Sequence, residues 1–157
     1  WTMAPEEKLK YLGLELPQVP APIGNFLPWR RVGNLLYLSG QGPRDEFGAI
    51  KVGKVGKDCS VDNAYDDARR VGLQILASIR QALGSLDRVE AVVKLFGMVN
   101  AVSTFTEHPK VINGCSDLFI EVLGKKGCHA RSAVGMDSLP NCMTVEIEAI
   151  IQVSESN

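Results

Sequence analysis

Two short segments near the C-terminal end combine alternating apolar residues with a few charged side chains. We expect both, about residues 129–136 and 144–153, to be β-strands. Arg131 lies in the first strand and Glu146 in the second. A guanidinium binds a carboxylate through two parallel hydrogen bonds, and a carboxyl group can hold a water or exchange protons. The two residues therefore predict chemistry on a small carboxylate, although an interface salt bridge between the strands is an alternative.

The alternation of side chains predicts on which face of a sheet these residues lie. In the first strand it separates Arg131 and Ala133 from a mostly apolar set that should meet the helices: Ala130, Ser132, Val134 and Met136. In the second strand, Glu146 is separated from Val145, Ile147, Ala149 and Ile151 in the same way. We therefore predict that Arg131 and Glu146 lie together on the face that the helices leave open. Glu148 fits a structural partner or a solvated strand residue.

Ser39, Gly40 and His129 are further candidates for ligand contacts. Ser39 and Gly40 end an apolar run, where a hydroxyl and free backbone N–H groups can bind a ligand oxygen. A simple turn that ends the strand is the alternative. His129 fits a packing or hydrogen-bonding role, and its titration range also permits acid–base work.

Several classes of function lack their sequence signals. The four cysteines contain no CxxC pair and the two histidines are far apart, so we expect neither a metal centre nor a cofactor. A net charge of −1 argues against nucleic acid as a partner. The chain contains neither a run of ~18 apolar residues nor a visible signal peptide. The scattered cysteines, with Cys115 expected in the core, favour a reducing compartment, so we predict a cytoplasmic protein without a membrane anchor.

The predicted elements form one α+β domain over residues 1–157. A short helix over 5–12 precedes a proline-rich lead-in and a hairpin over 30–39 with its turn at Gly33. A long helix over 61–83 is capped by Ser60 and ended by Gly84, and a second helix covers 109–123. A strand over 88–100 lies between them. Its predicted faces are Val89, Ala91, Val93 and Leu95 on one side and Val92, Phe96 and Met98 on the other.

Two long helices cover only one face of such a sheet. Several strands carry apolar residues on both faces, so a monomer would expose a large apolar surface. We therefore predict a closed homo-oligomer.

Four segments together carry a family resemblance: IGNF at 23–26, LYLSGQGP at 36–43, HARSAVGMDSLP at 129–140 and VEIEAI at 145–150. They resemble the Rid family, also called YjgF-like, whose deaminase members hydrolyse reactive enamines and imines. The resemblance covers about residues 22–153 and leaves about 1–21 as an N-terminal extension with the short helix. It implies a chorismate-mutase-like fold, with a mixed sheet and two long helices on one face, and a homotrimer with ligand sites in clefts between subunits.

The resemblance also implies a reaction and roles for individual residues. The expected reaction converts 2-imino acids or enamines to 2-keto acids and ammonia without a cofactor. Arg131 matches the arginine that binds the substrate carboxylate, and Glu146 matches the glutamate that places water. Five further positions are expected to line the substrate site: Ser39, Gly40, Phe26, Ala133 and His129.

Three of these positions depart from the pattern of the deaminases. Phe26 stands where a tyrosine is usual, Ala133 where a cysteine is common, and His129 where the motif begins with proline. Two alternatives therefore stand beside the deaminase: a non-catalytic, regulatory trimer that binds a small carboxylate, and a ribonuclease, which the charge disfavours.

Overall fold

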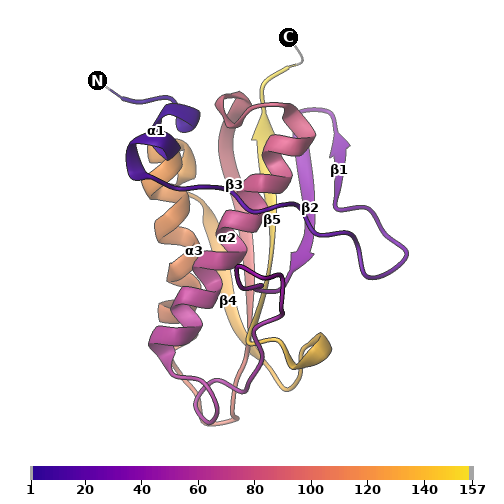
Figure 1. Cartoon of the computed structure of the whole chain (residues 1–157), viewed down its shortest axis with the longest axis vertical. Coiled ribbons are helices and arrows are strands. Elements are labelled where there is room, and N and C mark those ends of the chain that lie inside the picture. Colours follow the sequence, from indigo (N-terminus) through magenta and orange to yellow (C-terminus); the bar gives the residue numbers. More distant parts are fainter. Residues whose placement is uncertain (1, 156–157) are drawn as a thin grey trace.

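The computed structural model describes residues 2–155, so the outermost residues of the predicted domain, 1 and 156–157, lie outside the described part. The order of elements follows the predicted one (Figure 1). The helices are α1 (Pro5–Leu12), α2 (Val61–Leu83) and α3 (His108–Leu123), with short 3₁₀ turns η1 (Leu86–Arg88), η2 (Gly124–Gly127) and η3 (Pro140–Cys142). The strands are β1 (Trp29–Val32), β2 (Leu35–Gln41), β3 (Val89–Asn100), β4 (Ala130–Met136) and β5 (Val145–Val153).

The ends of α2 follow from capping. The side chain of Ser60 accepts a hydrogen bond from the N–H of Asn63 at 3.1 Å. Gly84 adopts φ 87°, and its N–H donates to the carbonyl of Arg80 at 2.7 Å. A left-handed residue at this position favours glycine, because a Cβ there is strained. The predicted bounds of α2 are confirmed, whereas α3 begins one residue earlier than predicted.

The five strands form one mixed sheet in the order β1-β2-β5-β3-β4. Among these strands of residues 2–155, only β3 and β4 pair in parallel, and the crossover between them contains α3. Both long helices lie on the same face of the sheet (Figure 1), and the core fills the space between the layers. The predicted α+β class, with two long helices on one face, is confirmed.

Bulges in β3 change which residues face the helices. The pairing of β3 with β5 shifts register between Val89 and Ala91 and again between Val92 and Lys94. Each extra residue reverses the alternation of side chains beyond it. Val92 is therefore 2% exposed and Val93 40% exposed, so the prediction that Val93 shares a face with Val89 and Leu95 is wrong.

The predicted orientation of β4 is also wrong. Arg131 pairs with Leu95 of β3, a fully buried residue on the helix side of the sheet, and residues paired across strands point to the same face. Arg131 and Ala133 thus face α3, whereas Val134 is 37% exposed on the other side. The prediction failed because polar groups on α3 accept hydrogen bonds from the guanidinium, so the helix side of this edge strand need not be apolar.

The face of the sheet opposite the helices carries exposed apolar side chains. Tyr37 of β2, Val93 of β3 and Val134 of β4 are all exposed on this open face. Within the apolar run 35–38 of β2, Leu36 and Leu38 are buried in this single chain, whereas Tyr37 is exposed.

Candidate functional site

A cavity of about 420 Å³ opens beside Glu146, and we call it the Glu146 cavity. Its walls come from the irregular lead-in over residues 19–28, the end of β2, one side of α2 and the region of η3. Four of the predicted site residues line it: Phe26, Ser39, Gly40 and Glu146. The other three, Arg131, Ala133 and His129, do not.

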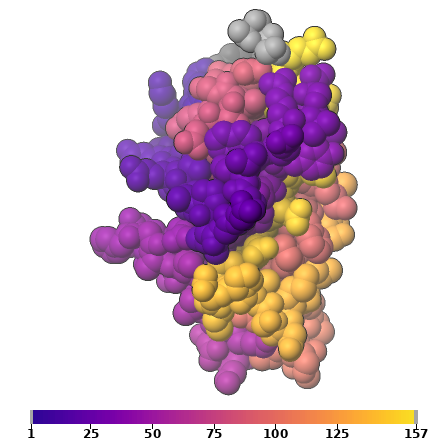
Figure 2. All heavy atoms as spheres, turned by 90° about the vertical axis from the view of Figure 1, so that its right-hand side faces the viewer, coloured from indigo at the N-terminus to yellow at the C-terminus, as the bar shows by residue number. Residues whose placement is uncertain are grey.

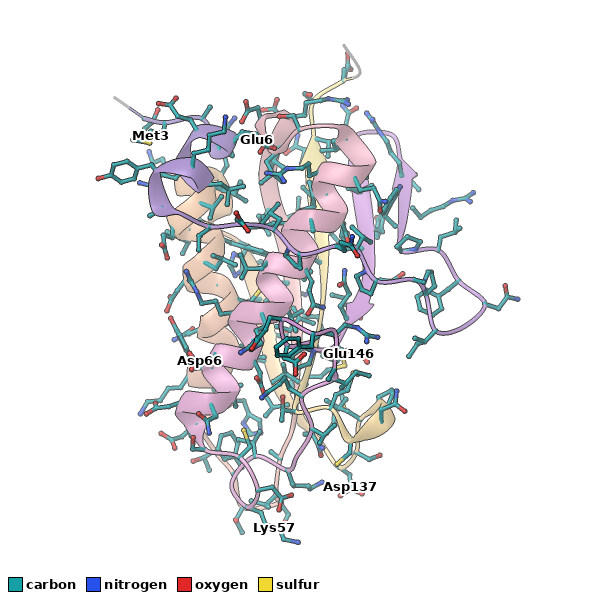
Figure 3. All side chains as sticks on the ribbon, in the orientation of Figure 1. Met3, Glu6, Lys57, Asp66, Asp137 and Glu146 are labelled. Atoms are coloured by element: carbon teal, nitrogen blue, oxygen red, sulfur yellow. The ribbon has the colours of Figure 1, made fainter. Side chains whose placement is uncertain are left out.

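The end of β2 creates the space for the Glu146 carboxyl group. The pairing of β2 with β5 shifts register between Leu38 and Gln41, so Ser39 and Gly40 leave the regular ladder. Figure 3 labels Glu146 near the point where β2 ends. A Cβ added at Gly40 would lie only 2.8 Å from Oε2 of Glu146. Glycine therefore permits the close approach of this carboxyl group to the β2 backbone.

Ser39 holds the lead-in against β2. Its N–H donates to the carbonyl of Pro28 at 3.0 Å, and its hydroxyl donates to the carbonyl of Leu27 at 2.5 Å. The predicted free N–H and hydroxyl donors at Ser39 are therefore already used. Ser39 shapes the wall of the cavity by fixing the adjacent chain.

Burial raises the pKa of Glu146, and the negative charge of the nearby Glu148 raises it further. Both groups lie on β5, two residues apart on the same side of the strand. A carboxylate whose pKa is raised is a stronger base than an ordinary carboxylate, so it accepts a proton more readily. The cavity thus contains a group suited to acid–base work.

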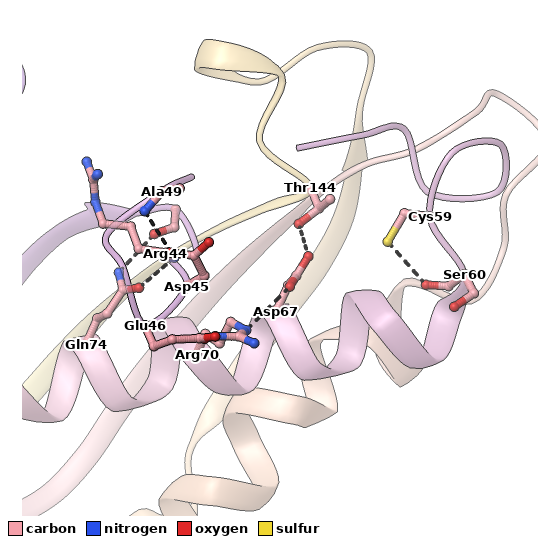
Figure 4. Close-up of polar contacts among 11 residues, drawn as sticks. Arg44, Asp45, Glu46, Ala49, Cys59, Ser60, Asp67, Arg70, Gln74 and Thr144 are labelled. Atoms are coloured by element: carbon pink, nitrogen blue, oxygen red, sulfur yellow. Dashed lines mark hydrogen bonds and ion pairs between the residues drawn. The ribbon is translucent and has the colours of Figure 1, made fainter. Parts of the chain in front are cut away.

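A buried hydrogen bond fixes the start of β5 just before Glu146. The hydroxyl of Thr144 donates to Oδ2 of Asp67 on α2 at 2.7 Å (Figure 4). Both residues are less than 5% exposed, and burial raises the pKa of Asp67. This contact ties the strand that carries Glu146 to the longest helix.

The guanidinium of Arg131 is held by α3. Its Nη1 donates to Oδ1 of Asn113 at 2.7 Å and to Oγ of Ser116 at 3.0 Å, and its Nη2 donates to the carbonyl of Pro109 at 3.4 Å. β4 is an edge strand of the sheet. The three contacts with α3 position the guanidinium through neutral acceptors, and it has no carboxylate partner among the described residues.

His129 supports the guanidinium of Arg131 indirectly, through Ser116. Its Nδ1 lies 2.6 Å from the carbonyl of Gly127, which can only accept, so Nδ1 carries a hydrogen. In the neutral ring, Nε2 then accepts from the hydroxyl of Ser116 at 2.9 Å. This geometry agrees with the hydrogen-bonding interpretation of His129, and its predicted contact with substrate stays a prediction.

Arg131 and Glu146 do not meet within one chain. Glu146 pairs with Met98 on the open face, whereas Arg131 lies on the helix face. In addition, β3 separates their two strands. The prediction that the two side chains project together from one face is therefore wrong.

Asn113 and Ser116 are the polar partners that the sequence reasoning missed. They lie three residues apart, which places them on the same side of a helix. Two polar residues at that spacing, within a helix whose apolar stripe is otherwise wide, were the available signal. Arg44 and Gln74, which also line the Glu146 cavity, carried no comparable signal.

Metal ligands do not gather in the described part of the chain: residues 2–155 contain no group of three or more His, Cys, Asp or Glu residues that could hold a metal ion. Among the same residues, no helix has both the length and the apolar character needed to cross a membrane.

Cys115 is fully buried as predicted, and burial raises the pKa of its thiol.

The mixed sheet, the two helices on one face and the pocket at the end of β2 define a class of small α+β proteins. A family model described as "YjgF/chorismate_mutase-like, putative endoribonuclease" matches residues 6–148. The chain belongs to this family, so the resemblance to Rid proteins and the chorismate-mutase-like fold are confirmed.

Similar proteins cover nearly the whole chain. Protein TCP17 of Trypanosoma cruzi is 40% identical over 147 residues, which are 93% of this chain and 92% of that protein. The crystal structure of Atu1372 from Agrobacterium tumefaciens is 44% identical with a TM-score of 0.87, covering 97% of this chain and 93% of that one. A protein from Shewanella oneidensis named as a putative endoribonuclease is 34% identical with a TM-score of 0.92, covering 96% and 100%.

Proposed function

We propose that the protein hydrolyses 2-imino acids or their enamine tautomers to 2-keto acids and ammonia. The observation that carries the proposal is that the carboxyl group of Glu146 lines a cavity and has a raised pKa. Membership of the Rid family supports the same reaction. Arg131, whose guanidinium has no carboxylate partner among residues 2–155, is the group that would bind the substrate carboxylate.

Such a site needs two copies of the chain. Because Arg131 and Glu146 lie on opposite faces of one sheet, a substrate that contacts both must lie between Glu146 of one copy and Arg131 of another. The exposed apolar side chains on the open face, including Tyr37 and Val93, support self-association. We propose a homotrimer, in which each cleft between neighbouring subunits holds one site.

Glu146 would act on water and then on nitrogen. Its carboxylate accepts a proton as a water oxygen attacks the carbon of the protonated imine, which forms a carbinolamine. The carboxyl group returns that proton to the nitrogen. The regenerated carboxylate then takes the hydroxyl proton of the carbinolamine as the C–N bond breaks, so that the carbonyl forms and ammonia leaves. An enamine first takes a proton on carbon to give the same imine. Arg131 keeps the carbon in place through the adjacent carboxylate.

A mixing experiment tests the chemistry and the shared site together. Arg131→Ala and Glu146→Ala should each lose nearly all activity on 2-imino acids generated by an amino-acid oxidase. When the two variants are unfolded together and refolded, random trimers should regain about one quarter of wild-type activity, because each intact site takes its two groups from different copies. Separately refolded and then mixed variants are the control.

The outcomes separate the two parts of the proposal. Activity of the wild type without any recovery in the mixture would place both groups of a working site in one copy, and the shared site would be wrong. Absence of imine hydrolysis by the wild type would contradict the deaminase itself. A mass of one chain in light scattering would contradict the trimer.

A regulatory trimer that binds a small carboxylate without turnover is the second candidate. Phe26 brings no hydroxyl and Ala133 no thiol, which favours binding over catalysis. Saturable binding of a 2-keto acid, lost in Arg131→Ala, in a protein that does not accelerate imine loss would support it. Ribonuclease activity is disfavoured by the net charge of −1.

A further inference from the structure

The lead-in over residues 19–28 gives the Glu146 cavity an apolar wall. Val19, Pro22, Ile23 and Phe26 line the cavity from this segment, and Met143 lines it from the region of η3. Figure 2 shows the indigo lead-in beside orange and yellow residues from the C-terminal third of the chain. Two distant parts of the sequence therefore enclose the space next to the reactive carboxyl group.

The polar residues of the cavity mostly satisfy one another. Gln41 donates from Nε2 to the hydroxyl of Ser78 at 3.0 Å. Gln74 donates from Nε2 to the carbonyl of Gly42 at 2.9 Å and to Oε1 of Gln41 at 3.3 Å. Its own Oε1 accepts from the N–H of Arg44 at 2.9 Å (Figure 4). A ligand side chain that enters this space thus meets an apolar wall and amides that are already paired.

The volume of the Glu146 cavity also favours a ligand with a large apolar side chain. A cavity of about 420 Å³ lies in the size range of sites that enclose whole small molecules, on the order of 300–1,000 Å³. A three-carbon imino acid held by its carboxylate would leave most of this space to water. A larger apolar side chain would displace that water and gain the burial of its surface.

We propose that the preferred substrates are 2-imino acids with large apolar side chains, branched or aromatic, and that this side chain occupies the Glu146 cavity. The inference rests on the proposed deaminase function and adds the substrate class. Arg44 is the one cation among the lining residues, and its Nη1 donates to the carbonyl of Gly48 at 2.9 Å. An acidic side chain that pairs with Arg44 is the competing prediction.

The test compares imino acids made in place by amino-acid oxidases. The imines derived from alanine, leucine, phenylalanine and glutamate are supplied at equal rates, and their loss is followed with and without the protein. We expect kcat/KM for the imines derived from leucine and phenylalanine to exceed that for the imine derived from alanine by about 10-fold or more. Each additional carbon group buried in an apolar pocket favours the larger substrate by such a factor. Equal values, or the highest value for the glutamate product, would overturn the inference.

A variant that fills the cavity ties the preference to this space. Ala21 lines the cavity from the exposed lead-in, and Ala21→Trp should reduce the leucine-to-alanine ratio of kcat/KM toward one. Ala49→Trp adds the same bulk at an exposed alanine outside the lining and should keep the wild-type ratio. An unchanged ratio in a folded Ala21→Trp protein would contradict the assignment.

Binding separates this inference from the proposed function. If no imine is lost faster, the deaminase is wrong, and calorimetry with the corresponding 2-keto acids still tests the cavity. We expect 4-methyl-2-oxopentanoate to bind about 10-fold more tightly than pyruvate, and Ala21→Trp to remove the difference. Tighter binding of pyruvate or of 2-oxoglutarate would overturn the apolar preference whether or not turnover occurs.

Discussion

Nη1 of Arg131 lies 2.7 Å from Oδ1 of Asn113, so an edge strand and the helix that crosses over it hold one guanidinium between them. Because Ser116 and the carbonyl of Pro109 accept from the same group, the planar fork has a defined direction. A charge with neutral partners keeps its attraction for an anion. This arrangement makes Arg131 suited to binding a carboxylate from outside its own chain.

Arg131→Lys should therefore fail to replace arginine. A lysine has one ammonium group and cannot reproduce contacts that two guanidinium nitrogens make to Asn113, Ser116 and Pro109. We expect Arg131→Ala to lower kcat/KM by about 100-fold, roughly 3 kcal/mol, with Arg131→Lys close to it. Steady-state kinetics of imine loss measure this. Arg31→Ala, at an exposed arginine of β1, is the control and should match the wild type.

Gly40→Ala should disturb the reaction more than the fold. The new methyl group would come within 2.8 Å of Oε2 of Glu146, but that oxygen ends a flexible side chain and can move away. We expect kcat to fall about 10-fold while the melting temperature changes little. The reaction slows because the displaced carboxylate of Glu146 is no longer correctly positioned for proton transfer. A normal kcat in a folded Gly40→Ala protein would show that this contact does not position Glu146.

Glu148→Gln should move the acidic limb of the pH–rate profile. The negative charge of Glu148 contributes to the raised pKa of Glu146, and its removal lowers that pKa. As the base must be ionised, the limb shifts to lower pH in the variant. Glu148 is exposed, so the shift should shrink as salt rises. A shift to higher pH would contradict the assignment of Glu146 as the base.

Glu146→Gln should stabilise the folded protein at neutral pH. The pKa of Glu146 is raised on folding, so its stabilising contribution is full at low pH and is lost as the pH rises through the folded pKa. Glutamine is free of this penalty. We expect the variant to melt at a higher temperature than the wild type at pH 8 and at an equal temperature at pH 4, while its activity is lost. An equal difference at both pH values would point to packing instead.

Local signals made much of the fold predictable. Ser60 and Gly84 mark the ends of α2 because capping and a left-handed residue depend on neighbours in sequence. The alternation of β5 predicts its two faces correctly, since Val145 and Ile147 pack on the helices while Glu146 does not. The cavity residues Ser39 and Gly40 were found from the motif that ends β2.

The failures have a tertiary cause. The bulges at Val89 and Val92 arise from pairing with β5, which no pattern within β3 reveals. The direction of Arg131 depends on polar residues of α3 that become its neighbours only after the crossover forms. An edge strand of small residues tolerates either orientation, so its own sequence does not decide between them.

Ser39 attaches the lead-in to the sheet through two hydrogen bonds. The site is thus built from two parts, the strands and the lead-in, and this has an evolutionary consequence. The charged groups belong to strands whose register the whole core enforces, whereas the neighbouring wall belongs to irregular chain that contributes little to the core. Exchanges within residues 19–28 can accumulate without unfolding the domain. Paralogues that share one reaction can thereby diverge in the metabolites they accept.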